Sequence, residues 1–147
     1  MQFKRKTRWL CAAVLTMACL HNNALAADEE LVREMAEASQ HMLNDLASQV
    51  TDLKAMADRK AFDTLTKTLE KQVSQWPTET DATEKYRPCK QALERALDVA
   101  RLTHAKATAT KAATPADEKA WLQEHAKLTD RRAVCERVLR HPLVRAS

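Results

Sequence analysis

The chain has 147 residues, no glycine and a formal net charge of +4, from 24 lysine and arginine residues against 20 aspartate and glutamate residues. The lack of glycine disfavours tight hairpins and phosphate-binding loops, because both need positive φ or a close backbone approach. Alanine, leucine, lysine, glutamate and arginine dominate instead, and this composition is typical of an all-α protein.

The first 26 residues have the three parts of a secretory signal peptide. Its cationic part consists of Lys4, Arg5, Lys6 and Arg8. An apolar run over residues 9–20 follows, and residues 24–26 read Ala-Leu-Ala, an A-x-A cleavage site. We therefore expect cleavage near Ala26, a mature chain that begins at Ala27, and export to the bacterial periplasm.

This segment has two other interpretations, an uncleaved membrane anchor and a lipoprotein signal. Its apolar run of twelve residues is shorter than the roughly 20 that a membrane-spanning helix needs, so we expect neither an uncleaved anchor nor stable membrane insertion. A lipoprotein signal is the second alternative, since Cys19 follows Ala18. However, Thr16 stands where a lipobox usually has an aliphatic residue, and the A-x-A site is the better signal.

Removal of the signal changes the charge balance. Four cations and no acids are lost, so the mature chain carries 20 cationic and 20 acidic side chains. A net charge of zero removes the usual electrostatic argument for nucleic-acid binding. The charges are nevertheless unevenly distributed, because residues 27–58 carry eight acids against two cations, and residues 131–145 carry five arginines against one glutamate.

A first helix is expected over residues 28–57, with Asp28 as its cap. Its apolar positions recur at alternating steps of three and four, a pattern typical of a helix with one buried stripe. This predicted stripe consists of Val32, Met35, Met42, Leu46, Leu53 and Met56, with Ser39 and Gln49 in its gaps.

A second helix is expected over residues 60–76. Its apolar stripe consists of Phe62, Leu65, Leu69, Val73 and Trp76. Nine residues separate Leu53 from Phe62 and turn a helix by about 180°, so a single rod would expose one of the two stripes. We therefore place a break near residues 58–60, with Asp58 as the cap of the second helix, and leave open whether the two helices are continuous.

The third helix has two alternative starts. Pro77 ends the second helix, and residues 78–86 are polar and expected to form a loop. Pro88 suits the first turn of a helix over residues 88–108, which is the start we choose. Residues 81–84 could instead cap an earlier start, and Pro88 would then kink the helix.

The fourth helix has clear start and stop signals. The tract over residues 106–113 is rich in alanine, threonine and lysine and is the least structured part of the prediction. Residues 114–117, Thr-Pro-Ala-Asp, supply a cap, a first-turn proline and an acidic residue for a helix over residues 115–140. The sequence thus predicts one small, four-helix bundle-like domain over residues 27–147.

Cys89 and Cys135 are the cysteines that remain after cleavage, and such a pair in an exported protein is more often bonded than free. Their midpoint, residue 112, lies between the third and fourth helices, so an antiparallel hairpin would bring them side by side. We predict a disulfide that staples this hairpin and stabilises the fold by about 4 kcal/mol. Redox or zinc chemistry is not expected, because there is no C-x-x-C and no cluster of histidines.

No motif in the chain indicates catalysis. The sequence lacks H-E-x-x-H, the E-x-x-H pairs of di-metal bundles, and G-x-S-x-G. Both remaining cysteines are expected in the disulfide, so no thiol is left to act as a nucleophile. We therefore expect a protein that is not an enzyme and that holds no cofactor.

The sequence is consistent with a non-catalytic module that binds another protein of the cell envelope. Within that class, an inhibitor or immunity-type protein against an envelope-targeted enzyme or toxin fits the size and the export signal. Its uneven charge would steer an oppositely charged partner. The candidate contact residues are the acids Glu30, Glu34, Glu37 and Asp45 and the arginines Arg131, Arg132, Arg137 and Arg140. Alternatively, the first and last helices are neighbours whose charges complement one another on solvated faces.

Two other functions stay open. The layout resembles the periplasmic four-helix b-type cytochromes, in which methionine and histidine ligate haem, and this resemblance in size and architecture implies a carrier in which Met35 or Met42 faces a histidine. His125 is the histidine we single out, because it shares a helix face with Trp121 and Cys135. In an envelope stress or chaperone-like protein, the methionines would form an exposed apolar face. The first stripe could also serve a homodimer.

Overall fold

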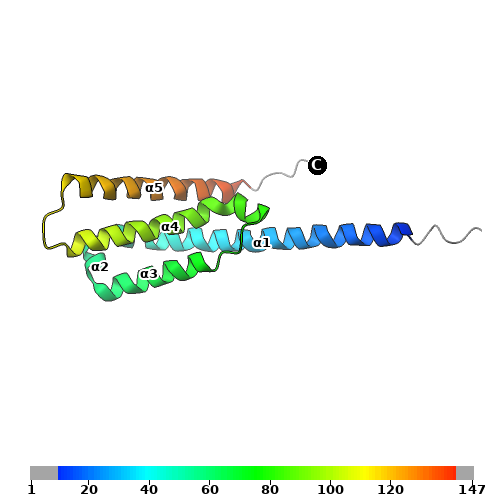
Figure 1. Cartoon of the computed structure of the whole chain (residues 1–147), viewed down its shortest axis with the longest axis horizontal. Coiled ribbons are helices and arrows are strands. Elements are labelled where there is room, and N and C mark those ends of the chain that lie inside the picture. Colours follow the sequence, from blue (N-terminus) through cyan, green and yellow to red (C-terminus); the bar gives the residue numbers. More distant parts are fainter. Residues whose placement is uncertain (1–9, 142–147) are drawn as a thin grey trace, which may run out of the picture.

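The computed structural model describes the backbone of residues 10–141 and the side chains of residues 28–141. The described residues form five helices and no strand, namely α1 (Leu10–Thr51), α2 (Leu53–Ala57), α3 (Arg59–Ser74), α4 (Asp81–Thr108) and α5 (Pro115–Arg140). The predicted all-α fold is therefore confirmed. The four long helices run alternately in opposite directions, and α2 is a short element at the end of the bundle where α1 turns into α3 (Figure 1).

The helix α1 begins much earlier than the predicted start at residue 28. It extends over 42 residues from Leu10, and its first part projects beyond the ends of α4 and α5 (Figure 1). The alanine- and leucine-rich segment before residue 28 has a high helix propensity, which accounts for the continuation. The cationic residues 4–8 of the expected signal lie outside the described residues. Within the part that is described, no helix combines the length and apolarity needed to cross a membrane.

The buried face of α1 differs from the predicted stripe. Its buried residues are Val32, Ala36, Ser39, Leu43 and Val50. At 100° per residue these five positions fall within about 60° of one another. Met35, Met42 and Leu46 lie to one side and are only partly buried, and Leu53 is 42% exposed. The predicted stripe was therefore wrong, because it was centred to one side of the buried face of α1. It followed the largest side chains and left out those that point most directly into the core.

The chain breaks twice between α1 and α3. Asp52 is the N-cap of α2, and its carboxylate accepts hydrogen bonds from the backbone N–H groups of Lys54 and Ala55. Asp58 is the N-cap of α3 and accepts from the backbone N–H of Ala61 at 2.9 Å. The break at Asp58 is the predicted one, and the break at Asp52 was not predicted. Aspartate can end one helix and start the next without glycine or proline, because its carboxylate satisfies the free N–H groups of the new helix.

The start predicted for the helix at residues 88–108 was wrong, because α4 begins at Asp81. Thr80 and Thr83 form a capping box, in which each hydroxyl oxygen accepts from the backbone N–H of the other residue. This cap starts the helix about two turns before Pro88, which lies inside α4. The buried side chains of Tyr86 and Cys89 flank the proline and fix this part of the helix by packing, which outweighs the lost backbone hydrogen bond.

The helix α4 is the centre of the bundle. Ten of its 28 residues are buried, and α1, α3 and α5 all pack against it. The helix α1 also packs on α5, whereas α3 packs mainly on α4 (Figure 1). The buried apolar residues of α3 that face this core are Leu65 and Leu69, and Trp76 follows at its end. The arrangement is thus a bundle built around one helix, with α3 on its own side.

The predicted disulfide joins α4 to α5. Cys89 and Cys135 are both fully buried, and their Cα atoms are 4.7 Å apart. The helix α5 starts at the predicted cap, where Thr114 and Asp117 form a capping box. Hydrogen bonds from the hydroxyl and then the backbone N–H of Thr114 lower the pKa of the Asp117 carboxyl below its usual value. The sequence therefore predicted both the disulfide that links this hairpin and the position of its turn.

Candidate functional site

The acids predicted to contact a partner lie on the outer face of α1. We call Glu30, Glu34, Glu37 and Asp45 the acidic ridge. At 100° per residue these positions point away from the buried side of α1. Glu37 pairs with Arg33 at 3.0 Å, whereas Glu30, Glu34 and Asp45 are exposed and have no ion pair within residues 28–141. Among the residues with described side chains, three charges of the acidic ridge therefore have no compensating ion pair.

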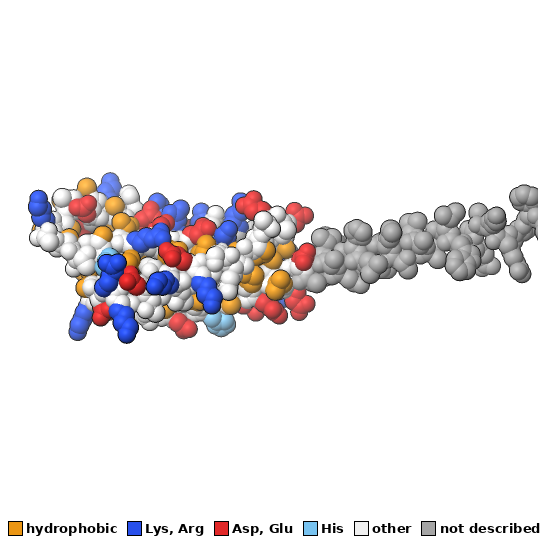
Figure 2. Space-filling view, turned by 60° about the horizontal axis from the view of Figure 1, so that its bottom comes forward, with side chains coloured by type: hydrophobic (Ala, Val, Ile, Leu, Met, Phe, Trp, Pro, Cys, Tyr) orange, Lys and Arg blue, Asp and Glu red, His pale blue; other side chains and the backbone are white. Residues whose placement is uncertain are grey.

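The charged side chains are also separated along the molecule. In Figure 2, acidic side chains gather at the right-hand end of the coloured surface, and lysine and arginine side chains are frequent toward its left-hand end. A surface that is polarised in this way presents different charges to partners that approach from different sides.

The four arginines of α5 do not form one surface. Arg132 turns toward α1, where its Nη2 donates to Oδ1 of Asn44 at 3.0 Å. Arg140 pairs with Glu136 one turn earlier. Arg137 is exposed, and its Nε donates to the carbonyl oxygen one turn earlier at 3.4 Å. The remaining member of the set, Arg131, is exposed as well.

A polar seam joins α1 to α5. Oδ1 of Asn44 accepts from Arg132 and also from Nε2 of Gln40, at 3.5 Å. Oε1 of Gln40 and Nε of Arg132 are buried without a partner among the described residues. No ion pair within residues 28–141 joins the acidic ridge to an arginine of α5. The first and last helices are thus neighbours, as one prediction stated, but amide groups and not complementary charges connect them.

The inner face of α5 is held to α4 by polar contacts. Nε1 of Trp121 donates to Oγ1 of Thr103 at 2.9 Å. Glu124 pairs with Arg95 of α4 at 3.2 Å and with Lys127 at 2.6 Å. The hydrogen bond from Lys127 is the largest of the effects that lower the pKa of Glu124, and partial burial opposes it. These groups connect the two helices and are not free to bind a partner.

The histidines and methionines considered for a carrier lie among protein side chains. His125 stacks on Trp121, with 5.6 Å between the ring centroids. Met35 and Met42 are partly buried against the core. His104, which the sequence analysis did not single out, stacks on Phe62, and its Nδ1 lies 2.6 Å from a backbone carbonyl oxygen of α2. In the part of the chain with described side chains, no group of three or more histidine, cysteine or acidic residues could hold a metal ion.

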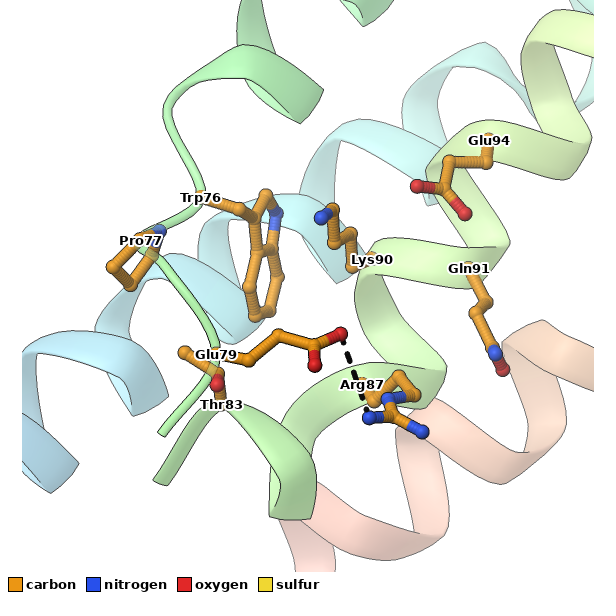
Figure 3. A pocket seen from close by; sticks show the side chains of 8 residues that line it. All are labelled: Trp76, Pro77, Glu79, Thr83, Arg87, Lys90, Gln91 and Glu94. Atoms are coloured by element: carbon orange, nitrogen blue, oxygen red, sulfur yellow. Dashed lines mark ion pairs between the residues drawn. The ribbon is translucent and has the colours of Figure 1, made fainter. Parts of the chain in front are cut away.

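A small pocket lies where α3 leads into α4 (Figure 3). We call it the Trp76 pocket, and its volume is about 300 Å³. Its lining residues are Trp76, Pro77, Glu79, Thr83, Arg87, Lys90, Gln91 and Glu94. Arg87 pairs with Glu79 at 3.6 Å and also with Glu84. The sequence placed Trp76 in the core, where it is, but did not show that its neighbours form a pocket.

Comparison with known proteins finds no matching family model, no matching curated protein and no matching solved structure. The function is therefore inferred from the geometry of the chain itself. The inference rests on two surface features, the acidic ridge and the Trp76 pocket.

Proposed function

We propose that the protein is an exported, periplasmic, non-catalytic module that binds another protein of the cell envelope. The acidic ridge is the observation that carries this proposal, because Glu30, Glu34 and Asp45 are exposed and have no ion pair within residues 28–141. Glu30 and Glu34 are one turn apart and repel one another, and Asp45 extends the negative charge to about four turns of the same helix. A basic partner would relieve this repulsion and would be steered to the ridge during its approach.

Two observations support export. Disulfides form and persist in oxidising compartments such as the periplasm, and the Cys89–Cys135 disulfide is buried between two helices. The A-x-A site at residues 24–26 precedes Glu29, which pairs with Lys85 of α4 at 2.5 Å. The A-x-A site is the second observation, and cleavage there would begin the mature chain at Ala27, just before the Glu29–Lys85 ion pair.

The finer proposal is an inhibitor or immunity-type protein against an envelope-targeted enzyme or toxin. The acidic ridge lies on a helix whose opposite face is anchored in the core by Val32, Leu43 and Val50. A rigid binding face loses little conformational entropy when it binds, which favours tight inhibition. The arginines of α5 are the less favoured contact surface, because Arg132 and Arg140 already have partners within the chain.

Charge reversal on the acidic ridge tests the proposed partner surface. The tagged protein, with its own leader, is expressed in a bacterial host, and proteins retained from envelope extracts are quantified by mass spectrometry. We expect Glu30→Lys, Glu34→Lys and Asp45→Lys together to reduce recovery of the main retained protein more than tenfold, because like charges in an interface cost several kcal/mol. Asp130→Lys on α5, at an exposed acid without an ion pair within the described residues, is a single-reversal control away from the ridge and should change little, whereas Asp45→Lys alone should already reduce recovery.

Two results would contradict the proposal. A partner that is retained equally by the wild-type chain and by the triple variant does not use the acidic ridge. A protein that stays in the cytoplasmic fraction with its first 26 residues attached is not exported. Cell fractionation and the mass of the purified chain, which should begin at Ala27 and be lighter by two hydrogens than the reduced chain, decide the second point.

A further inference from the structure

The Trp76 pocket contains a buried hydrogen-bond donor that has no acceptor. Trp76 is 8% exposed, and its indole Nε1 is buried without a partner among the described residues. Folded proteins leave few buried N–H groups unpaired, because such a group loses its bonds to water and gains nothing in return. An unpaired donor in the wall of a pocket therefore indicates where the acceptor of a ligand would bind.

A second donor faces the same place. Lys90 is partly buried, lines the pocket and has no ion pair within residues 28–141. Figure 3 shows its ammonium group on the side of the indole ring that carries the nitrogen. Two donors, one of them cationic, thus converge on one wall, and the structure gives neither of them an acceptor.

The other charged groups of the pocket limit the charge of the ligand. Arg87 is already held by Glu79 and Glu84, so Lys90 is the cation that is available. Glu94 lies on the same side of α4 as Lys90 and would repel an anion. A phosphate carries more charge and usually needs an arginine or several N–H donors. A singly charged carboxylate fits a pocket with one available cation and one nearby glutamate better.

We propose that the Trp76 pocket binds a carboxylate group, whose oxygens accept hydrogen bonds from the indole N–H of Trp76 and the ammonium of Lys90. The apolar part of the ligand packs against the indole ring and Pro77. The indole nitrogen is screened from solvent, so the flexible side chain of Lys90 rotates to admit the ligand and then pairs with it. A volume of about 300 Å³ holds a small carboxylic acid or the last residue of a peptide that ends in a free carboxylate.

The acidic ridge takes no part in this site, so the carboxylate site and the proposed protein-binding function can fail independently. The two possible sources of the carboxylate, a free acid and the C-terminus of a peptide, share the same chemistry at Trp76 and Lys90. They differ in whether further backbone of the ligand contributes contacts outside the pocket.

Indole NMR of the mature protein, with ¹⁵N-labelled tryptophan, tests the proposal. The indole of Trp121 is an internal reference, because its N–H already donates to Thr103 at 2.9 Å. We expect N-acetyl-leucine to shift the Trp76 indole proton downfield in a saturable manner and to leave the Trp121 signal in place. N-acetyl-leucinamide has the same shape without the charge and should cause no such shift. A Trp76 signal that ignores the acid, or that responds equally to the amide, overturns the proposal.

Two substitutions examine the charges of the pocket. Lys90→Gln should weaken binding of N-acetyl-leucine about tenfold, since a hydrogen bond from a charged donor is lost. Lys119→Gln, at an exposed lysine of α5, is the matched control and should leave the affinity unchanged. Glu94→Gln removes the opposing charge and should tighten binding about twofold. Unchanged affinity in Lys90→Gln, with unfolding temperatures equal to the wild type, overturns the assigned contact.

A peptide distinguishes the two sources of the carboxylate. N-acetyl-Ala-Ala-Leu presents the same terminal carboxylate with two additional residues. If it shifts the Trp76 signal at clearly lower concentrations than N-acetyl-leucine, the site recognises peptide C-termini. If the two affinities are equal, the site recognises a small free acid. Both results support a carboxylate site, whereas a lack of response to both acids overturns it.

Discussion

The helices α4 and α5 have similar lengths, 28 and 26 residues, but the bundle holds them in different ways. Ten residues of α4 are buried, whereas Leu128 and Cys135 are the buried residues of α5. The helix α5 packs on the core through Leu128 and the partly buried Val138 and Leu139, and it is also attached through the disulfide and through specific polar contacts. These contacts are the Thr103–Trp121 hydrogen bond and the ion pairs Arg95–Glu124 and Lys106–Glu118.

This comparison shows why the two helices can carry different surfaces. A helix held by apolar burial on several sides, such as α4, has little surface left for other roles. A helix held by a narrow apolar stripe, one covalent bond and a few polar contacts can keep most of its surface in solvent, where α5 carries Arg131, Arg137 and the 52% exposed Leu122. We expect substitutions in α4 to lower the free energy of unfolding when they remove buried volume. Substitutions in α5 should lower it when they remove an individual bond to α4.

Removal of the disulfide should have the largest effect. In the chain-entropy model, opening the loop of 46 residues between Cys89 and Cys135 lowers the free energy of unfolding by about 4 kcal/mol. Urea unfolding of a variant with both Cys89→Ala and Cys135→Ala measures the loss, and reduction of the wild-type disulfide should give a similar value. Amide hydrogen exchange should accelerate more in α5 than in α4. A loss below about 1 kcal/mol would contradict the assigned role of the disulfide.

Equivalent leucine truncations in the two helices should differ. Leu93 of α4 is fully buried, and Leu93→Ala should lower the free energy of unfolding by about 3 kcal/mol, because it removes apolar contacts and leaves a cavity. Leu122→Ala on α5 should change it by no more than about 0.5 kcal/mol. Chemical denaturation of both variants makes the comparison. Equal losses would mean that α5 buries more apolar surface than its 52% exposed leucine indicates.

Loss of one hydrogen bond between α4 and α5 should have a moderate effect. Thr103 is fully buried, and its hydroxyl accepts from Nε1 of Trp121 and donates to the carbonyl oxygen of Val99. Thr103→Val keeps the volume but leaves the indole N–H without an acceptor, so the free energy of unfolding should fall by about 1–2 kcal/mol. Adding Trp121→Phe should cost less in the Thr103→Val background than in the wild type, because the bond is already lost. Strictly additive losses would show that the two side chains are not coupled.

Local signals in the sequence predicted much of this fold. Asp58 was predicted as a cap because an aspartate stands between two apolar stripes that are out of phase, and the disulfide followed from two cysteines equally distant from a loop. The same rules failed where two local signals competed. Pro88 was given more weight than the alternative cap at residues 81–84, although the Thr80–Thr83 capping box sets the start of α4. In α1, two overlapping series of apolar residues fit a helical period, and only packing on α4 selects one.

The candidate surfaces were less predictable, because side-chain pairing depends on neighbours from other helices. The outward direction of the acidic ridge follows from helical spacing alone. The attachment of Arg132 to Asn44 joins residues 88 positions apart, and nothing in either local sequence indicates it. The Trp76 pocket was not predictable from local sequence either, although the burial of the Trp76 indole was correctly expected. The packing of α3 against α4 decides that the indole N–H lies beside Lys90 and has no acceptor among the described residues.

The smallest expected effect is the pH dependence from Glu124, which pairs with Lys127 of its own helix and Arg95 of α4. The hydrogen bond from Lys127 is the main reason that the pKa of Glu124 lies below its ordinary value of 4.5. A carboxyl with a lowered pKa in the folded state contributes stability above the unfolded pKa and loses it as the pH falls through the folded pKa. Glu124→Gln should thus lower the free energy of unfolding by at most about 1 kcal/mol at neutral pH.

The difference between wild type and Glu124→Gln should fade as the pH falls below 4.5 and through the lowered pKa of Glu124, because the carboxylate becomes protonated. Urea unfolding of both proteins at several pH values measures it. Lys127→Gln is the companion variant, and in its background Glu124→Gln should have a smaller effect, because the main partner of the carboxylate is gone. A difference that persists unchanged at low pH would mean that Glu124 holds α5 to α4 by packing. In that case side-chain packing would hold α5 in the bundle, as it holds α4, to a greater extent than the exposed surface of α5 indicates.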